Sequence, residues 1–215
     1  MMKFGFYVSR TATRLCKLIQ DKRSKGKIAF VLIDCTTNDI LRNLCVNRNI
    51  PFYEYSYKAL GLIGKEQNAF ISDKFMELMD NYNVTYSFIC GSRILQGELL
   101  NKYQWHLVNL HPAVLPAYKG KCAIDQALAD GALLLGNTAH FIDSELDAGI
   151  MIMQNLFLTN NFTCYDDVLD KQHEVILQLM KWFEEGRVSI EGHRCIVKDA
   201  EYKIGEYIPA LDILS

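Results

Sequence analysis

The chain has 215 residues, of which 50% are hydrophobic and 22% charged, and its formal net charge is −2 at pH 7. A chain of this size and composition buries a core without disulfides or metals to staple it. The balanced charge excludes the strongly basic surface of a nucleic-acid-binding protein, and no apolar run reaches the roughly 20 residues that cross a bilayer. We therefore expect a cytoplasmic protein without nucleic acid or membrane as partner. We interpret its N-terminal residues as a first strand rather than a signal peptide.

Seven cysteines occur, an odd number, and no two have the CxxC spacing of a metal or redox site. Several lie inside apolar runs, a pattern typical of reduced, buried thiols in the cytosol. We therefore predict no disulfide framework and no metal site. The cysteines are Cys16, Cys35, Cys45, Cys90, Cys122, Cys164 and Cys195.

The first half of the chain alternates short apolar runs with segments of helical periodicity. Strands are expected at residues 3–9, 27–34, 51–56, 86–90 and 106–110. Helices are expected between them, at residues 13–21, 38–47, 66–81 and 95–102. Strands that alternate with helices in this way form βαβ units, so the sequence predicts an α/β fold with a mostly parallel sheet.

The second half has a different pattern. Strand-forming residues fill 137–143 and 150–158, with a turn between them, and a helix is expected at 165–185, stopped by Gly186. Residues 188–190 and 194–197 flank Gly192 and predict a small hairpin, whereas residues 206–215 have no clear pattern. We expect one domain over residues 1–200, with 201–215 as its C-terminal tail.

Asn109 and His111 stand two residues apart at the end of an apolar strand. Side chains alternate along a strand, so these two project to one face, and Pro112, which cannot donate to the ladder, ends the strand. The pair is therefore expected at the carboxyl edge of the sheet, where ligands bind in folds of this class. Taken alone, the motif is equally compatible with a capped strand end and a histidine whose hydrogen bonds are satisfied.

Asp147 lies in a Leu-Asp-Ala-Gly turn between two predicted strands. By itself an aspartate there is typical of turn chemistry, and His140 in its apolar run is typical of a core histidine. The order of the four polar residues along the chain, Asn109, His111, His140 and Asp147, is a more specific signal of function than any one of them alone. An amide, an imidazole and a carboxylate near strand ends suit acyl transfer onto an amine.

The motifs are densest between Ser92 and Gln154. They read NLHP at 109–112, LPAYKG at 115–120, NTAHFID at 137–143 and LDAG at 146–149. In them the chain resembles the formyltransferase family that uses 10-formyltetrahydrofolate, most of all its phosphoribosylglycinamide formyltransferase branch. The resemblance implies a Rossmann-like, mostly parallel twisted sheet with helices on both faces, with 10-formyltetrahydrofolate as co-substrate and no metal.

The resemblance also implies roles for the polar residues. His111, as imidazolium, and the Asn109 amide would hydrogen-bond the oxyanion that forms when an amine attacks the formyl carbon. Asp147 would favour the charged form of His111 and help to move the proton from the amine to the leaving nitrogen. His140 would support Asp147 or an ordered water, and Thr138 would support the site from further back.

The family holds the pterin of the folate against two loops. Here the first loop follows the fourth predicted strand, at residues 91–95, and the second is the turn at 142–147. A helix-start cation paired with a nearby carboxylate is the alternative for Arg93. The bond before Pro116 is a candidate cis peptide in a loop that shapes the site. The residues implied in folate binding are Arg93, Ile94, Leu95, Ile142, Asp143 and Glu145.

The acceptor side departs from the phosphoribosylglycinamide branch. That branch binds substrate phosphate with a glycine-rich loop after the first strand, whereas this chain has no glycine at 8–14. Ser9, Arg10 and Thr11 are expected to contact the acceptor instead, or to belong to an ordinary N-capped helix with solvated arginines. In the late helix, Gln172 stands where the family has a glutamate that faces the acceptor.

Because the donor-side motifs are retained and the acceptor side differs, we expect a nucleotide-linked amino sugar as acceptor. The alternative is phosphoribosylglycinamide formyltransferase of purine biosynthesis, and a second alternative is a protein that binds folate or a sugar nucleotide without catalysis. Methionyl-tRNA is disfavoured, because that branch has an additional C-terminal domain and needs a basic surface. The apolar residues of the tail and last hairpin are candidates for covering a homodimer surface.

Overall fold

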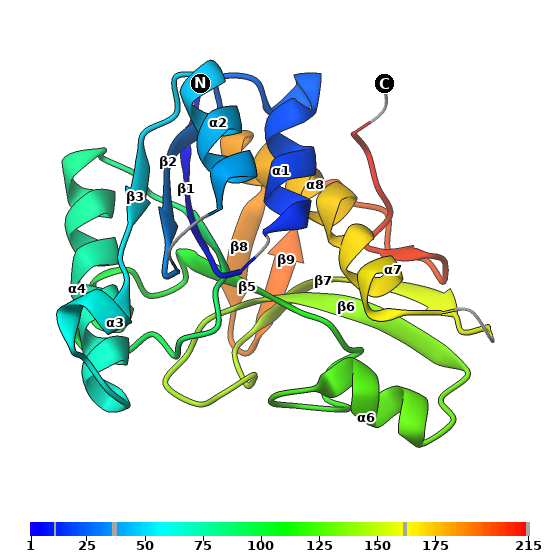
Figure 1. Ribbon diagram of the computed structural model, residues 1–215. Helices are drawn as coiled ribbons and strands as arrows, with labels where there is room; N and C mark the ends of the chain where they lie inside the picture. Colours follow the sequence, from blue (N-terminus) through cyan, green and yellow to red (C-terminus); the bar gives the residue numbers. More distant parts are fainter. Residues whose placement is uncertain (11, 36–37, 161–162, 214–215) are drawn as a thin grey trace. The chain divides into compact units, whose positions relative to one another are not determined.

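The computed structural model describes residues 1–10, 12–35, 38–160 and 163–213. The chain divides into two compact units, Met1–Val108 and Asn109–Ser215. Each unit is built around hydrogen-bonded strands with helices packed against them (Figure 1).

The first unit contains a parallel sheet with the strand order β4-β1-β2-β3. Its strands are β1 (Phe4–Val8), β2 (Ile28–Ile33), β3 (Phe52–Glu54) and β4 (Ser87–Cys90). All residues of β1 and β2 are buried, as expected for central strands covered on both faces. The four predicted strands are thus confirmed, with ends that differ by one or two residues.

Helices cover this sheet. They are α1 (Thr13–Gln20), α2 (Asp39–Asn47), α3 (Tyr57–Leu60), α4 (Lys65–Asn81) and α5 (Glu98–Lys102), with a 3-10 turn at Lys22–Ser24. Helices α1 and α2 lie side by side (Figure 1). The ring of Phe75 in α4 packs on Tyr7 and Phe30, with centroids 6.2 and 5.5 Å apart. The sequence did not predict α3, and α5 is shorter than expected because Gly97, at φ 74°, precedes its first turn.

The second unit begins within strand β5 (Leu107–His111) and has the strand order β10-β7-β6-β5. Strands β6 (Leu134–Phe141) and β7 (Met151–Leu158) form an antiparallel pair, and β10 (Tyr207–Ile208) is antiparallel to β7. Strands β8 (Val188–Glu191) and β9 (Arg194–Val197) form a separate hairpin, as predicted. The predicted end of β5 before Pro112 is also confirmed.

Three helices belong to the second unit: α6 (Ala123–Ala129), α7 (Tyr165–Asp170) and α8 (Gln172–Glu184). The single helix predicted at 165–185 is therefore two, interrupted at Lys171, and Gly186 at φ 65° follows its end as expected. Helix α6 was not predicted, since it is short and its N-cap, Cys122, makes no side-chain capping hydrogen bond. The expected domain limit at residue 200 stays a prediction.

The cysteines are free thiols, and burial, which was expected for several of them, is complete for one and partial for four. Cys45 is buried, whereas Cys122 and Cys164 are exposed. Both exposed residues precede the first turn of a helix, where the side chain points to solvent. Among the described residues, no group of three or more histidine, cysteine, aspartate or glutamate side chains is placed to hold a metal ion.

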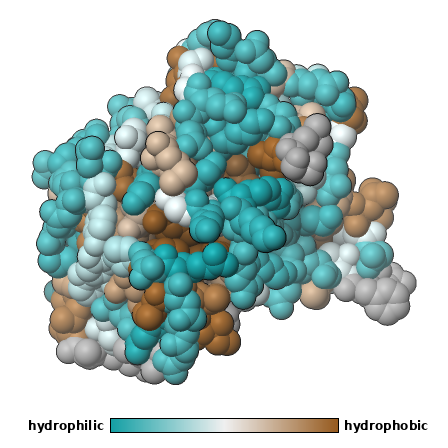
Figure 2. All heavy atoms as spheres, turned by 90° about the horizontal axis from the view of Figure 1, so that it is seen from above, coloured by the Kyte–Doolittle hydropathy of each residue, from teal (hydrophilic) through white to brown (hydrophobic). Residues whose placement is uncertain are grey.

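On the face that Figure 2 shows, hydrophilic residues cover most of the area and hydrophobic residues form smaller, separated patches. No helix in the described part of the chain is both long enough and apolar enough to cross a membrane.

Candidate active site

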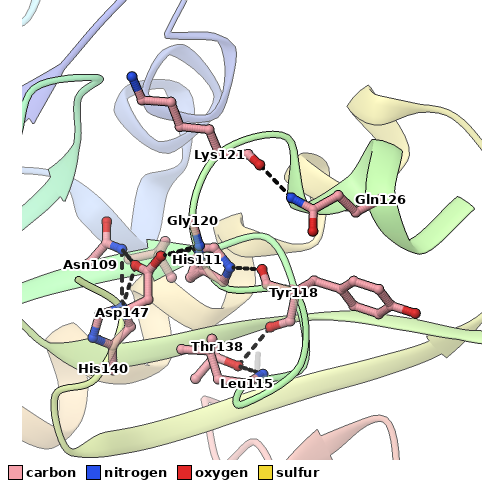
Figure 3. A network of polar contacts seen from close by, with 12 residues as sticks. Asn109, His111, Leu115, Tyr118, Gly120, Lys121, Gln126, Thr138, His140 and Asp147 are labelled. Atoms are coloured by element: carbon pink, nitrogen blue, oxygen red, sulfur yellow. Dashed lines mark hydrogen bonds and ion pairs between the residues drawn. The ribbon is translucent and has the colours of Figure 1, made fainter. Parts of the chain in front are cut away.

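Three polar side chains of the second unit converge around the carboxylate of a fourth residue, Asp147 (Figure 3). Asn109 and His111 come from the last residues of β5, His140 from β6, and Asp147 from the loop between β6 and β7. His111, His140 and Asp147 are buried, and Asn109 is half-buried. The sequence predicted all four, and the fold brings them together.

The Asp147 carboxylate has a partner on each side. Its Oδ2 accepts a hydrogen bond of 2.8 Å from the Gly120 backbone N–H and lies 3.3 Å from His111 Nδ1. Its Oδ1 lies 3.4 Å from the Asn109 amide nitrogen and 3.6 Å from His140 Nε2. The carboxylate is thus surrounded by donors, which offset the cost of burying its charge.

These partners decide the ionisation of Asp147. Burial alone raises the pKa of its carboxyl group, but the His140 contact, the Gly120 N–H and the charge of His111 outweigh burial. The pKa of Asp147 therefore lies below its usual value, and the group is a carboxylate at neutral pH.

The backbone that carries Asp147 is tightly turned. Asp147 has φ 50°, in the left-handed region that aspartate tolerates better than most residues. Two residues later, a Cβ at Gly149 would stand 1.8 Å from the Phe141 carbonyl oxygen. Only glycine fits there, so the Asp-Ala-Gly order in the sequence is required by this close approach.

The ring of His111 has an acceptor at each nitrogen. Its Nε2 lies 2.8 Å from the Tyr118 carbonyl oxygen, and its Nδ1 faces the Asp147 carboxylate. A neutral ring has one N–H and satisfies only one of these acceptors, whereas the imidazolium donates to both. Both ring nitrogens of His111 therefore face an acceptor, one of them the carboxylate of Asp147.

His140 has the opposite arrangement. Its Nδ1 lies 2.9 Å from the Phe141 carbonyl oxygen, so Nδ1 carries the proton. Its Nε2 faces both the Asn109 amide nitrogen, 3.1 Å away, and Asp147 Oδ1, 3.6 Å away, so it accepts from the amide in the neutral ring and donates to the carboxylate in the charged ring. The Asn109 nitrogen thus faces His140 and Asp147, while its oxygen points away from both (Figure 3).

Thr138 fastens the loop that precedes Tyr118 and Gly120. Its hydroxyl donates to the Ala113 carbonyl at 2.7 Å and accepts from Leu115 N–H at 3.0 Å and from the Gln154 amide at 2.9 Å. Gln154 also donates to the Leu115 carbonyl at 3.0 Å. The Leu115–Pro116 bond in this loop is cis, as the sequence pattern suggested.

The sequence did not single out three of these contributions. Tyr118 and Gly120 act through backbone atoms, which no residue type reveals, and Gln154 acts through the loop. The only signal for them was that Tyr118 and Gly120 lie within the LPAYKG motif and that Gln154 ends the stretch in which the motifs are densest.

The predicted folate residues lie in two segments, one in each unit. In the first unit, the Arg93 guanidinium lies 4.8 Å from the centroid of the Tyr57 ring, Ile94 is half-exposed and Leu95 is buried. In the second unit, Ile142 is half-buried and Asp143 and Glu145 are exposed. Their role in folate binding stays a prediction.

The predicted acceptor residues of the first unit have mixed placements. Ser9 Oγ accepts a 2.7 Å hydrogen bond from Ser92 N–H, and Arg10 is exposed, with φ 57°. Thr11 lies outside the described residues. The alternative of an ordinary N-capped helix is wrong in one respect. Helix α1 has Ala12 at its N-cap and no side-chain capping hydrogen bond.

The predicted contact of Gln172 with the acceptor does not agree with its position in the structure. Its side chain is fully buried, and its amide donates to the Leu110 carbonyl at 3.3 Å and to Asn137 Oδ1 at 2.7 Å. An amide used in this way inside the second unit ties α8 to strands β5 and β6. With no exposed atom it cannot contact an acceptor, and we leave it out of the acceptor site.

Known proteins are similar to this chain in sequence and in fold. The sequence model of the formyl transferase family matches residues 2–179. The formyltetrahydrofolate deformylase of Haemophilus influenzae is 35% identical over 119 residues, which are 55% of this chain and 41% of that protein. The formyltetrahydrofolate deformylase of Bacillus subtilis is 23% identical over 202 residues, which are 92% of this chain and 65% of that protein. The chain thus spans less than two thirds of the length of either relative.

A solved structure extends the comparison to the fold. Glycinamide ribonucleotide transformylase 1 from Symbiobacterium toebii superposes with a TM-score of 0.79 at 24% identity, covering 93% of this chain and 95% of that one. The predicted fold class, a mostly parallel sheet with helices, is confirmed by this likeness and by the strand order.

Proposed function

The chain belongs to the formyl transferase family, and on this premise we propose that it transfers the formyl group of 10-formyltetrahydrofolate to a primary amine on a nucleotide-linked amino sugar. The match over residues 2–179 confirms the resemblance that the motifs indicated. In the proposed reaction the amine nitrogen bonds to the formyl carbon, the bond from that carbon to the folate nitrogen breaks, and one proton passes from the amine to the folate nitrogen.

The observation that carries the proposal is the buried pair of His111 and Asp147. A cation beside the position of a developing oxyanion stabilises it most where water is excluded, and His111 is 4% exposed. Asp147 keeps the ring charged and is itself ionised, so it accepts a proton from the attacking amine directly or through one water. The reaction then needs neither a metal nor a nucleophile on the protein.

Two donors have to be redirected for this role. The His111 Nε2–H now meets the Tyr118 carbonyl, and one Asn109 amide hydrogen meets Asp147 at the longer distance of 3.4 Å. If both donors turn to the oxyanion, each gives up its present hydrogen bond and forms a new one. Catalytic hydrogen bonds commonly reach their final geometry only with the reactants in place.

The first unit offers groups that suit a folate. Arg93 Nε is buried and has no hydrogen-bond partner among the described residues, so it is a donor that a pterin carbonyl or a carboxylate would satisfy. Next to it, Ile94 is 51% exposed, an apolar surface suited to a flat ring. In the second unit, Ile142, Asp143 and Glu145 stay candidates for folate binding.

Charge on the loop beside Asp147 suits an acceptor that carries phosphate. Lys119 and Lys121 flank Gly120, whose N–H donates to Asp147, and both are exposed. Neither forms an ion pair within the part of the chain that the structure describes. A nucleotide-linked amino sugar and glycinamide ribonucleotide both carry phosphate. The absence of glycine after β1 favours the nucleotide-linked amino sugar as acceptor. Arg10 is a further candidate for contacting the acceptor.

Hydrolysis is a second candidate function, because the two relatives above are named deformylases. In that reaction water replaces the amine, and formate is released. The same His111 and Asp147 would serve, with Asp147 accepting a proton from water.

The test mixes 10-formyltetrahydrofolate with glycinamide ribonucleotide and a panel of uridine- and thymidine-diphosphate 4-amino sugars, and follows formylated products by mass spectrometry. Formylation of a sugar supports the proposal, and formylation of glycinamide ribonucleotide replaces it with the purine alternative. Tetrahydrofolate released with formate and without any acceptor indicates deformylation. Thermal stabilisation by folate with no turnover under any condition leaves a binding protein.

A further inference from the structure

A second buried carboxylate lies in the first unit, and no role has been assigned to it so far. Asp34 follows the last residue of β2 and is 6% exposed. Three hydroxyl groups donate to its Oδ2: Tyr7 at 2.7 Å, Tyr57 at 3.1 Å and Ser92 at 3.4 Å. These donors come from β1, from α3 and from the segment after β4, so one oxygen ties three parts of the unit together.

The Tyr7 hydroxyl and that of Ser9 accept hydrogen bonds from the backbone of the segment at 91–95. The Arg93 N–H donates to the Tyr7 hydroxyl at 3.2 Å, and the Ser92 N–H donates to Ser9 Oγ at 2.7 Å. The Arg93 guanidinium stacks on the Tyr57 ring, 4.8 Å from its centroid. The backbone of Arg93 thus contacts Tyr7 and its side chain contacts Tyr57, and both tyrosines donate to Asp34.

The packing leaves little freedom for this arrangement. Tyr7 is fully buried, and a Cβ on Gly91 would stand 2.2 Å from its ring. Only glycine allows the backbone to approach the ring so closely. Burial, and then the charge of Asp34, raise the pKa of Tyr7 far above its usual value, so its hydroxyl remains a donor at any ordinary pH.

We propose that Asp34 is a positioning residue for the folate donor, which fixes the 91–95 segment through the hydroxyls of Tyr7, Tyr57 and Ser92. The inference rests on the proposed function, since it takes that segment as part of the folate site. Asp34 touches no reactant. It holds Arg93 and Ile94 in one geometry, so that their contacts to the pterin are formed without an ordering cost.

The test compares Tyr7→Phe and Asp34→Asn with wild type. Tyr7→Phe keeps the ring and removes the hydroxyl that links Arg93 N–H to Asp34. The chain offers a matched control in Tyr103→Phe, because the Tyr103 hydroxyl donates to Asp80 at 2.6 Å, also in the first unit but between α4 and the residue that follows α5.

Two readouts are needed. The first is the Kd for 5-formyltetrahydrofolate, a stable isomer of the donor, measured by calorimetry on the full chain. The second is amide hydrogen exchange at Ser92 and Arg93, with the melting temperature as a check on folding. We expect Tyr7→Phe and Asp34→Asn to weaken folate binding about 3- to 10-fold and to speed exchange at Arg93, while kcat at saturating donor changes less than about 2-fold.

The outcomes separate this inference from the proposed function. Wild-type affinity in both variants overturns the positioning role, even if exchange at Arg93 is faster. Weaker binding in Tyr103→Phe of the same size also overturns it, because the effect would then be one of general stability. If wild type binds no folate, the proposed function is wrong, and with it the positioning role toward folate. Amide exchange at Arg93 then shows only whether the Tyr7 hydroxyl holds the 91–95 segment in place.

Discussion

His111 Nδ1 and Asp147 Oδ2 lie 3.3 Å apart, with both side chains 5% exposed. Such a pair is stable only when each partner has further hydrogen bonds, since two isolated charges lose more by leaving water than they regain by attraction. The Gly120 N–H donates a hydrogen bond to Asp147, and the Tyr118 carbonyl accepts a hydrogen bond from His111. Backbone atoms of a single loop thus complete the hydrogen bonds of both side chains.

Asp147→Asn should abolish most of the activity. The amide cannot accept the proton from the nucleophile and no longer favours the charged ring of His111. We expect kcat to fall by about 10³- to 10⁴-fold, while the Kd for folate changes little. Steady-state kinetics with the acceptor found in the product screen would measure this. Asp130→Asn, an exposed carboxylate after α6, removes the same charge and should leave kcat unchanged.

Asn109→Ala should be less severe. The variant loses one oxyanion donor but keeps the charge pair, so kcat should fall by about 10²- to 10³-fold. Asn101→Ala in α5, at an exposed position, is its control. Near-normal turnover in Asn109→Ala would refute the role of its amide.

Acid should remove the contribution of Asp147 to stability. The pKa of this carboxyl group is lower in the folded protein than in the unfolded chain, where it is about 3.9. The stabilisation is therefore fully present above the unfolded-state value and is lost as pH falls through the folded-state value. We expect the difference in unfolding free energy between wild type and Asp147→Asn to shrink as pH falls below about 4. Urea unfolding at each pH would measure it, and a difference that grows in acid would contradict the assignment.

Thr138→Val should destabilise the protein. Valine has the same shape but leaves the Ala113 carbonyl and the Leu115 N–H without their partner, at a cost of about 1–3 kcal/mol. Urea unfolding would measure this loss. Thr159→Val is the comparison, because that hydroxyl donates one bond, to the Ala132 carbonyl, and it should cost less. Equal losses in the two variants would mean that the loop does not depend on Thr138.

Much of the fold could be predicted because its strands are apolar runs of the right length. Strands β1 and β2 are buried at every residue, and such runs are visible without any partner. Strand β10 has two residues and exists only through its pairing with β7, so no local pattern reveals it. Helix α3 is also short, with four residues, too few to show a helical pattern.

The candidate site could be predicted as far as side chains define it. Asn109 and His111 follow from strand alternation, and Asp147 from its turn and the motif order. The error at Gln172 has a physical cause: sequence alignment places a residue on a helix, but only packing decides whether its amide meets solvent or the Asn137 side chain. Backbone donors such as Gly120 N–H cannot be identified from residue type at all.

Gly149 is expected to be the least replaceable residue of the Asp147 turn. In Gly149→Ala the new Cβ would meet the Phe141 carbonyl at 1.8 Å, so the turn or the end of β6 must move. Either movement shifts Asp147 away from His111, and we expect both a stability loss of at least about 2 kcal/mol and a strong fall in kcat. Gly205→Ala is the matched control, because a Cβ there meets nothing within 4 Å. If Gly149→Ala folds with wild-type stability and turnover, Asp147 does not depend on this close approach, and the turn tolerates more freedom than its geometry implies.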